Sequence, residues 1–293
     1  MGYRLGVDIG GTFTDAILID EATGAFSISK VSSTPSDPSE GFLHATDRIL
    51  AAATADPASL RYVVHGTTVA TNAIIQRRIA RTALITTDGF RDVLEIGRQI
   101  RPSLYDIQFA KPVPLVPRTL CFGIPERLDW RGEVLVPLDE AAVRAVARSF
   151  AELGVESVAV CLLHAYANPV HEDRIGAILA EECPAVAVSL SSNIVPEFRE
   201  YDRASTVVIN AGIQPIVQEY LGSIEERLRG RGVEAELLVM QSGGGVLTFE
   251  SAGERPVFIV ESGPAAGVIA TSHLARTLGL ADAISFDMGG TTA

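Results

Sequence analysis

Two stretches near opposite ends of this chain repeat one pattern: an apolar strand, an aspartate, one apolar residue, two glycines and a threonine. The first runs from Val7 to Thr12 and the second from Phe286 to Thr291. Paired glycines let backbone N–H groups approach phosphate oxygens, because no Cβ stands in the way. An aspartate at a strand end can hold a magnesium ion through water or orient an attacking group. Two such turns would grip a nucleoside triphosphate from both sides.

A single Gly-Gly-Thr also occurs in a plain β-hairpin turn, so one copy alone would favour that ordinary interpretation. Two copies, each with an aspartate two residues before the glycines, favour nucleotide binding. The first turn is followed by an apolar strand at residues 16–19 and not by a helix. This excludes a P-loop, which also needs a Gly-Lys-Ser/Thr ending, and the Rossmann fingerprint, whose turn opens a helix.

Strand and helix patterns alternate between the two turns. Short apolar runs predict strands at residues 5–7, 16–19, 26–28, 62–64, 83–86, 158–163, 186–190, 237–240 and 283–286. Asp37, Pro38 and Glu40 predict the start of a helix with a capping box, and Asp139 predicts another N-cap. Further helices are expected at residues 68–76, 169–181, 204–229 (where Pro215 can kink the helix) and 264–278. The alternation predicts an α/β architecture with mixed sheets.

The composition restricts the class of protein further. Hydrophobic residues make up 47% of the chain and charged residues 20%, which supports a packed core. A formal net charge of −12 argues against a broad nucleic-acid surface. The three scattered cysteines form no Cys-x-x-Cys pair, so neither a disulfide framework nor a thiolate zinc site is indicated. The chain shows no signal-peptide pattern and no run of transmembrane length. We therefore expect a cytoplasmic protein without nucleic-acid or membrane partners.

The paired turns resemble the two phosphate loops of the actin/hexokinase/Hsp70 ATPase superfamily. Five segments are similar to the hydantoinase A/5-oxoprolinase family in particular, and the similarity extends over the whole chain. These segments are residues 8–15, 65–72, 87–92, 262–267 and 287–292.

The resemblance implies a ribonuclease-H-like, actin-like ATPase fold, an α/β class in which helices flank mixed sheets. It implies a hydantoinase/oxoprolinase N-terminal domain at residues 1–190 and the start of the core ATPase domain at residues 191–293. Members of the family are much longer, and the aspartate that usually follows the second turn is absent here. We therefore expect a fragment, truncated before its second half, that binds ATP poorly and is inactive alone.

The resemblance also implies a function. Family members are ATP-dependent hydrolases of cyclic amides such as hydantoins and 5-oxoproline, or ATP-dependent carboxylases of ketones, and bacterial members commonly work with a B-type subunit. The expected reaction transfers a phosphoryl group from ATP, with Mg²⁺, to an amide or carbonyl oxygen. Three functions stay open in this order: ring opening of a cyclic amide, carboxylation of a ketone, and a non-enzymatic nucleotide-binding or scaffold role.

Three groups of residues are expected to form the site. Asp8 and Asp287 would bind the metal and, together with His65, would be catalytic. The predicted cofactor-binding residues are Gly10, Gly11, Thr12, Thr14, Asp15, Gly289, Gly290, Thr291 and Thr292. The predicted substrate-binding residues are Thr67, Thr68, Asp88, Arg91 and Arg98.

Some of these residues also have an ordinary structural interpretation. Thr67 suits an N-cap and His65 a hydrogen-bonded position at a strand end, although the family resemblance favours function. Arginines between residues 88 and 101 suit a carboxylate-bearing substrate, yet the same segment suits a solvated helix face with ion pairs. The segments 241–245 and 262–264 each suit either a phosphate or substrate contact or a plain turn and capped helix.

Overall fold

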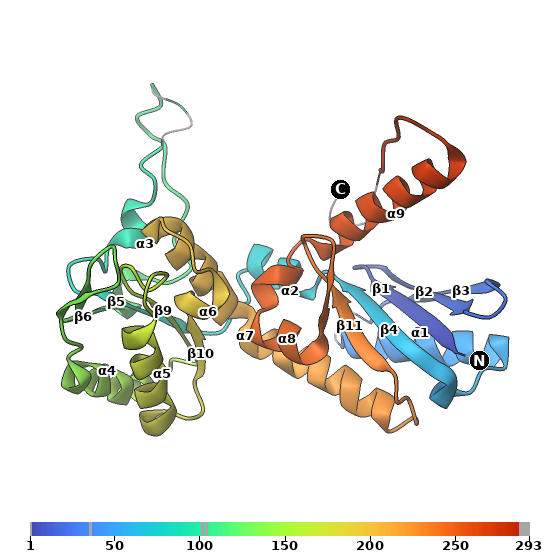
Figure 1. The fold of residues 1–293 in the computed structure, drawn as a ribbon, viewed down its shortest axis with the longest axis horizontal. Helices are drawn as coiled ribbons and strands as arrows, with labels where there is room; N and C mark the ends of the chain where they lie inside the picture. Colours follow the sequence, from blue (N-terminus) through green and yellow to red (C-terminus); the bar gives the residue numbers. More distant parts are fainter. Residues whose placement is uncertain (1, 35–36, 101–102, 104, 287–293) are drawn as a thin grey trace. The chain divides into compact units, whose positions relative to one another are not determined.

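The computed structural model describes residues 2–34, 37–100, 103 and 105–286, and the chain divides into two compact units (Figure 1). Residues 1–75 and 216–293 form one unit, called here the terminal unit. Residues 76–215 form the other, called the inserted unit. The long helix α7 (Glu200–Arg229) contributes to both, and the division falls after Pro215. This division does not coincide with the expected domain boundary after residue 190, which stays a prediction.

The terminal unit is built on a six-stranded mixed sheet in the order β12-β11-β4-β1-β2-β3. The strands β1 (Tyr3–Ile9), β2 (Phe13–Asp20) and β3 (Phe26–Ser32) form an antiparallel meander. β4 (Leu60–Thr67) and β11 (Glu236–Met240) run parallel to β1, and β12 (Val246–Thr248) pairs antiparallel with β11. The carboxyl ends of β1, β4 and β11 therefore meet at one edge of the sheet, where open α/β sheets bind ligands.

Helix α1 (Pro38–Ala53) packs on β1, β2 and β3 and begins as the sequence predicts. The Asp37 carboxylate accepts a hydrogen bond from the Ser39 N–H at 3.0 Å. The predicted capping box is wrong in one respect. The N–H of Asp37 donates to the Thr34 carbonyl at 3.0 Å and not to Glu40.

The carboxyl-terminal part of α7 lies on the same sheet face as α1. Phe42 of α1 and Tyr220 of α7 both contact the His65 ring, at centroid distances of 5.0 and 5.7 Å. Arg231, just after α7, pairs with Asp47 of α1 at 3.0 Å. These two helices close the core of the terminal unit over the apolar side chains of β1 and β4.

The inserted unit has its own four-stranded sheet, in which every strand pair is parallel. Its order is β10 (Ala187–Leu190), β9 (Ser157–Cys161), β5 (Thr82–Thr87) and β6 (Cys121–Ile124). Every residue of β5 and β9 is buried, as expected for central parallel strands. Asp139 caps α4 (Glu140–Leu153) as predicted, accepting from the Ala142 N–H at 3.0 Å.

The remaining elements are helices, short 3-10 turns and one two-stranded hairpin. They are α2 (Val69–Ile75), α3 (Val93–Ile96), α4 (Glu140–Leu153), α5 (Val170–Glu182), α6 (Ser191–Ile194), α8 (Phe249–Glu254), α9 (Ser262–Leu278), η1 (Pro57–Ser59), η2 (Arg118–Leu120), η3 (Pro256–Ile259), β7 (Arg127–Leu128) and β8 (Val134–Val136). Together with the two sheets they confirm the predicted class, an α/β fold with helices flanking mixed sheets. Within the described ranges, no helix is long and apolar enough to cross a bilayer.

A buried carboxylate joins α5 to the ends of two strands in the inserted unit. Glu172 accepts hydrogen bonds from the Leu162 N–H at 2.9 Å, the Ser191 hydroxyl at 2.6 Å and the Ser192 N–H at 2.8 Å. Burial raises the pKa of this carboxyl, although the hydrogen bonds oppose the shift. Three donors to one side chain tie α5, the end of β9 and α6 together.

The predicted last strand at residues 283–286 is wrong. These residues follow α9 as irregular chain and pair with no strand in the described ranges. Ile284 and Phe286 are 93% and 82% exposed. An apolar run has strand propensity, but a strand forms only where a neighbour supplies hydrogen-bonding partners and a surface to cover.

Candidate functional site

The first glycine turn lies at the carboxyl edge of the six-stranded sheet. Asp8, two residues before the turn, pairs in register with Asp15 of β2 and with Gly66 of β4. A Cβ atom on Gly66 would lie 2.6 Å from Oδ1 of Asp8, so any other residue at this position would force the carboxylate to move. Asp8 is exposed, and its side chain occupies the space that the missing Gly66 side chain leaves open.

The turn itself is held in shape by Ser33, a residue that the sequence analysis missed. The Ser33 hydroxyl donates to the Gly10 carbonyl at 2.8 Å, and the Ser33 N–H donates to the Thr12 carbonyl at 2.9 Å. The Gly10 N–H donates to the Phe13 carbonyl at 3.0 Å. By contrast, the N–H groups of Gly11 and Thr12 donate to no acceptor within the described residues. The turn therefore presents two backbone donors with no partner among the described residues.

Thr14 and Asp15, both predicted to bind the cofactor, have side chains that interact with other residues of the protein. Thr14 is fully buried, and its hydroxyl lies 3.0 Å from that of Ser33. Because the Ser33 proton is used on a carbonyl, Thr14 is the donor in this pair. Asp15 forms an ion pair with Lys30 at 2.8 Å, and Lys30 in turn lies over the Phe13 ring. In this arrangement both residues support the turn, and direct contact with a cofactor stays a prediction.

His65 lies one strand away from Asp8 and is fully buried. Its Nδ1–H donates to the Val7 carbonyl at 3.0 Å, because a carbonyl can only accept, and Nε2 accepts from the Tyr220 hydroxyl at 2.7 Å. Burial lowers the pKa of His65 from 6.5 to about 4, and the bond to Val7 opposes the shift. The imidazole is therefore neutral near pH 7. Both ring nitrogens are occupied, which favours the structural interpretation over proton transfer.

Thr67 and Thr68 lie at the carboxyl end of β4 and at the start of α2. The Thr67 hydroxyl accepts from the Val69 N–H at 3.2 Å, as an N-cap does, and Thr67 is buried. The Thr68 hydroxyl accepts from the Asn72 amide at 3.1 Å. Thr68 is half-buried, so of these two hydroxyls it is the more accessible to a ligand.

The start of α9 is attached to this same edge of the sheet. The Glu261 N–H donates to the Thr71 hydroxyl at 3.0 Å, and the Ser262 hydroxyl donates to the Thr67 carbonyl at 3.4 Å. Glu261 has φ 60°, ψ 27°, a left-handed conformation that is unusual for a residue other than glycine. Sequence reasoning could not identify Glu261, because nothing in its residue type signals a positive φ.

Asp88, Arg91 and Arg98 lie in the inserted unit, whereas Thr67 and Thr68 lie in the terminal unit. Asp88 is exposed at the end of β5, and Arg91 donates to the Arg118 carbonyl at 3.2 Å. Arg98 is neutralised by Asp202, to which its Nε donates at 2.9 Å. Asp287, Gly289, Gly290, Thr291 and Thr292 lie outside the described residues. The second turn and its relation to Asp8 therefore stay predictions.

The residues present at the first turn fit a magnesium nucleotide. The two backbone donors of Gly11 and Thr12 suit phosphate oxygens, and glycine keeps the approach open. Magnesium is usually bound by one or two carboxylates, water and substrate phosphates, and not by an all-protein cage. Asp8, exposed beside the turn, is a carboxylate that could take this part.

Comparison with known families matches the chain over most of its length. The profile described as "Hydantoinase/oxoprolinase N-terminal region" matches residues 4–183, and the profile described as "Hydantoinase/oxoprolinase" matches residues 203–293. An uncharacterized protein of Methanocaldococcus jannaschii is 42% identical over 296 residues, which cover 100% of this chain and 43% of the relative.

Two relatives have names that state an activity. The caprolactamase subunit alpha of Pseudomonas jessenii is 36% identical, with 99% of this chain and 42% of the relative covered. The acetophenone carboxylase gamma subunit of Aromatoleum aromaticum is 33% identical, with 98% and 41% covered. The crystal structure of the ATP-dependent caprolactamase superposes with a TM-score of 0.86 at 35% identity, over 98% of this chain and 42% of that chain. The chain thus spans about two-fifths of the length of these relatives.

Proposed function

Because this chain belongs to the hydantoinase/oxoprolinase family, we propose that it carries the first phosphate-binding turn of an enzyme that uses ATP to open a cyclic amide. A ring amide resists attack by water because its carbonyl carbon is a poor electrophile. Transfer of the γ-phosphoryl group to the carbonyl oxygen breaks the bond to ADP and creates a good leaving group on that carbon. Water adds to that carbon, and the ring C–N bond then breaks to give an amine and an acyl phosphate. A second water hydrolyses the acyl phosphate to a carboxylate and inorganic phosphate.

In this proposal the N–H groups of Gly11 and Thr12 bind phosphate oxygens, while Asp8 holds magnesium or orients the attacking group. Magnesium, when bound, supplies positive charge that offsets the charge on the phosphates. Thr68 is the accessible hydroxyl beside the turn and is proposed to contact the substrate. His65 acts through position only: it fixes the carbonyl of Val7 and thereby the strand that carries Asp8.

The observation that carries this proposal is the geometry of the first turn. Two backbone donors that have no acceptor in the described part of the chain stand next to an exposed carboxylate, at the carboxyl edge of three parallel strands. The opposite turn would contribute Asp287, Gly289, Gly290, Thr291 and Thr292. Because several relatives are named as subunits, we propose that this protein also has a protein partner, the B-type subunit that the family resemblance implies. A small cyclic amide is proposed as the substrate.

The test uses the full-length protein together with its B-type subunit. ATP hydrolysis is measured against 5-oxoproline, hydantoins and ketones, each with and without bicarbonate. We expect a cyclic amide to stimulate phosphate release. Asp8→Asn should lower the stimulated rate about 100-fold, since a group that contacts developing charge is lost. Asp47→Asn, an exposed aspartate on α1, is the matched control and should retain the rate. Stimulated turnover that survives Asp8→Asn unchanged would refute the role of the first turn.

A second candidate function is ATP-dependent carboxylation of a ketone. It is favoured by the similarity to the acetophenone carboxylase gamma subunit over 98% of this chain. The same screen distinguishes the two, because ATP turnover that requires both a ketone and bicarbonate would select carboxylation. If ATP binds but no compound stimulates its hydrolysis, a nucleotide-binding or scaffold role replaces both.

A further inference from the structure

The hydroxyl of Tyr220 on α7 completes a buried hydrogen-bond network that reaches the strand carrying Asp8. Tyr220 is buried, and its hydroxyl donates to Nε2 of His65 at 2.7 Å. On the other side of the imidazole ring, the Nδ1–H donates to the Val7 carbonyl at 3.0 Å. The network therefore links α7, β4 and β1 within the terminal unit.

Each donor in this network is fixed. The Val7 carbonyl can only accept, so the neutral imidazole carries its proton on Nδ1 and accepts on Nε2. Burial raises the pKa of Tyr220, and a hydrogen bond from the Thr67 hydroxyl opposes this shift. The phenol thus stays protonated, and it accepts one hydrogen bond while it donates another. Hydrogen bonds connected in this way polarise and strengthen one another in a buried environment.

The network ends beside the two positions that shape the surroundings of the Asp8 carboxylate. Val7 precedes Asp8 in β1, and the Val7 carbonyl and the Asp8 N–H belong to one planar peptide unit. His65 precedes Gly66 in β4, and Gly66 pairs with Asp8 across the two strands. Because a Cβ on Gly66 would lie only 2.6 Å from Oδ1 of Asp8, a shift of β4 against β1 changes the space open to this carboxylate.

The part of α7 that carries Tyr220 is fixed against the start of α1. Arg227, about two turns further along the helix, donates to the Ser39 hydroxyl at 2.7 Å and to the Asp37 carboxylate at 3.4 Å. These bonds hold the carboxyl-terminal part of α7 in place. The Tyr220 hydroxyl is therefore aimed at His65 before any ligand binds.

We propose that Tyr220 is a positioning residue for the first glycine turn. It acts through His65, which holds the peptide between Val7 and Asp8, and it thereby fixes the direction of the Asp8 carboxylate. A phenylalanine would fill the same space in the core, so this role requires the hydroxyl itself. The assignment rests on the proposed function and extends its site to α7.

The first test measures ATP turnover by the full-length enzyme with its B-type subunit. Tyr220→Phe should lower kcat about tenfold, because a small misplacement of a reacting group slows the reaction strongly. The Kd of ATP, measured by calorimetry, should change by less than about twofold, because the N–H groups of Gly11 and Thr12 stay in the turn. A loss seen only in ATP binding, or a kcat within about twofold of that of the unaltered enzyme, would overturn the proposal.

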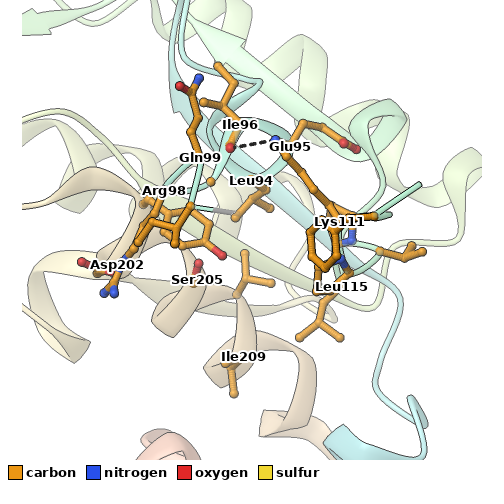
Figure 2. Close-up of a pocket in the computed structure, with 18 residues that line it drawn as sticks. Leu94, Glu95, Ile96, Arg98, Gln99, Lys111, Leu115, Asp202, Ser205 and Ile209 are labelled. Carbon is orange, nitrogen blue, oxygen red and sulfur yellow. Dashed lines mark hydrogen bonds and ion pairs between the residues drawn. The ribbon is translucent and has the colours of Figure 1, made fainter. Parts of the chain in front are cut away.

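Two control variants on the same helix separate the hydroxyl from a loss of packing. Ile224→Val removes one buried methyl group about one turn after Tyr220, and it should lower stability by an amount similar to Tyr220→Phe. Tyr201→Phe makes the same substitution in the inserted unit. There, Tyr201 lines a cavity of about 630 Å³ between the segments 94–100 and 109–115 and the first turns of α7 (Figure 2). Both controls should keep the kcat of the unaltered enzyme, and urea titrations compare the stabilities. An equal fall of kcat in Ile224→Val would assign the effect to packing and contradict the proposal.

A double-mutant cycle tests whether Tyr220 acts through His65. His65→Leu removes both hydrogen bonds of the ring, so adding Tyr220→Phe to it should cause no further loss of kcat. Additive losses would show that the hydroxyl acts by another route, and the proposal would be wrong. Circular dichroism melts report whether His65→Leu folds. If it does not, the comparison of Tyr220→Phe with the two controls decides.

Amide NMR spectra of the chain without nucleotide give a readout that does not depend on activity. Tyr220→Phe should shift the signals of Asp8 and Gly10, and the two controls should leave these signals in place. Unshifted signals would exclude the positioning role, even in an enzyme that turns over ATP. If no compound stimulates ATP turnover, the proposed function fails, and the NMR comparison alone then decides whether Tyr220 positions the turn.

Discussion

The pH dependence of the unfolding free energy tests whether His65 is buried and neutral in the terminal unit. The folded protein lowers the pKa of this imidazole from 6.5 to about 4, chiefly through burial, since the charged form would lose its hydration. Each pKa unit corresponds to about 1.36 kcal/mol, so the full shift amounts to about 3 kcal/mol of unfolding free energy. His65 is fully buried, and solvent screening therefore reduces this figure little.

The sign of the effect follows from which state binds the proton. The unfolded chain protonates His65 near pH 6.5, whereas the folded protein keeps it neutral until about pH 4. Between these values the unfolded state carries the additional proton, so the unfolding free energy falls as the pH falls. The contribution is present above pH 6.5 and is lost as the pH approaches 4. From pH 7 to pH 5 the loss amounts to about 2 kcal/mol.

Urea unfolding at pH 7 and pH 5 measures this loss by far-ultraviolet circular dichroism. His65→Gln removes the titrating group, so its stability should depend on pH by about 2 kcal/mol less than that of the unaltered chain. His44→Gln, at an exposed position of α1, should keep the full pH dependence. An NMR titration of the His65 ring reports its pKa directly. A value above 6 in the folded protein would refute the burial argument.

Three further changes test other parts of the structure. Gly66→Ala places a Cβ 2.6 Å from Oδ1 of Asp8 and should lower ATP turnover of the full-length enzyme at least tenfold. Gly222→Ala is the control, because its Cβ would meet nothing within 4 Å, and it should leave turnover unchanged. Equal turnover rates in the two variants would contradict the packing argument. Ser33→Ala removes the hydroxyl that holds the glycine turn and should cost about 1 kcal/mol in a urea titration, together with weaker ATP binding by calorimetry. Glu172→Ala leaves three donors without their acceptor, two of them buried, and should lower stability by about 3 kcal/mol. A loss below about 1 kcal/mol would contradict its bridging role.

The amino-acid sequence by itself determined many of the local elements and the position of the first glycine turn. Asp37 and Pro38 start α1 because a side-chain acceptor and a fixed φ suit the first helical turn. The turn at Gly10 and Gly11 was readable because glycine is the residue that lets backbone donors face a ligand. These features depend on neighbours a few residues away, so the sequence carries them directly.

Only the tertiary structure decided which residues meet. The sequence placed His65 at a strand end but could not show that Tyr220, 155 residues later, closes over it and makes it a core residue. Nor could it show that Ser33 would hold the glycine turn, or that residues 283–286 would find no strand to pair with. Burial, strand pairing and charge neutralisation depend on groups that are distant in the chain, and these are fixed only when the two units have folded.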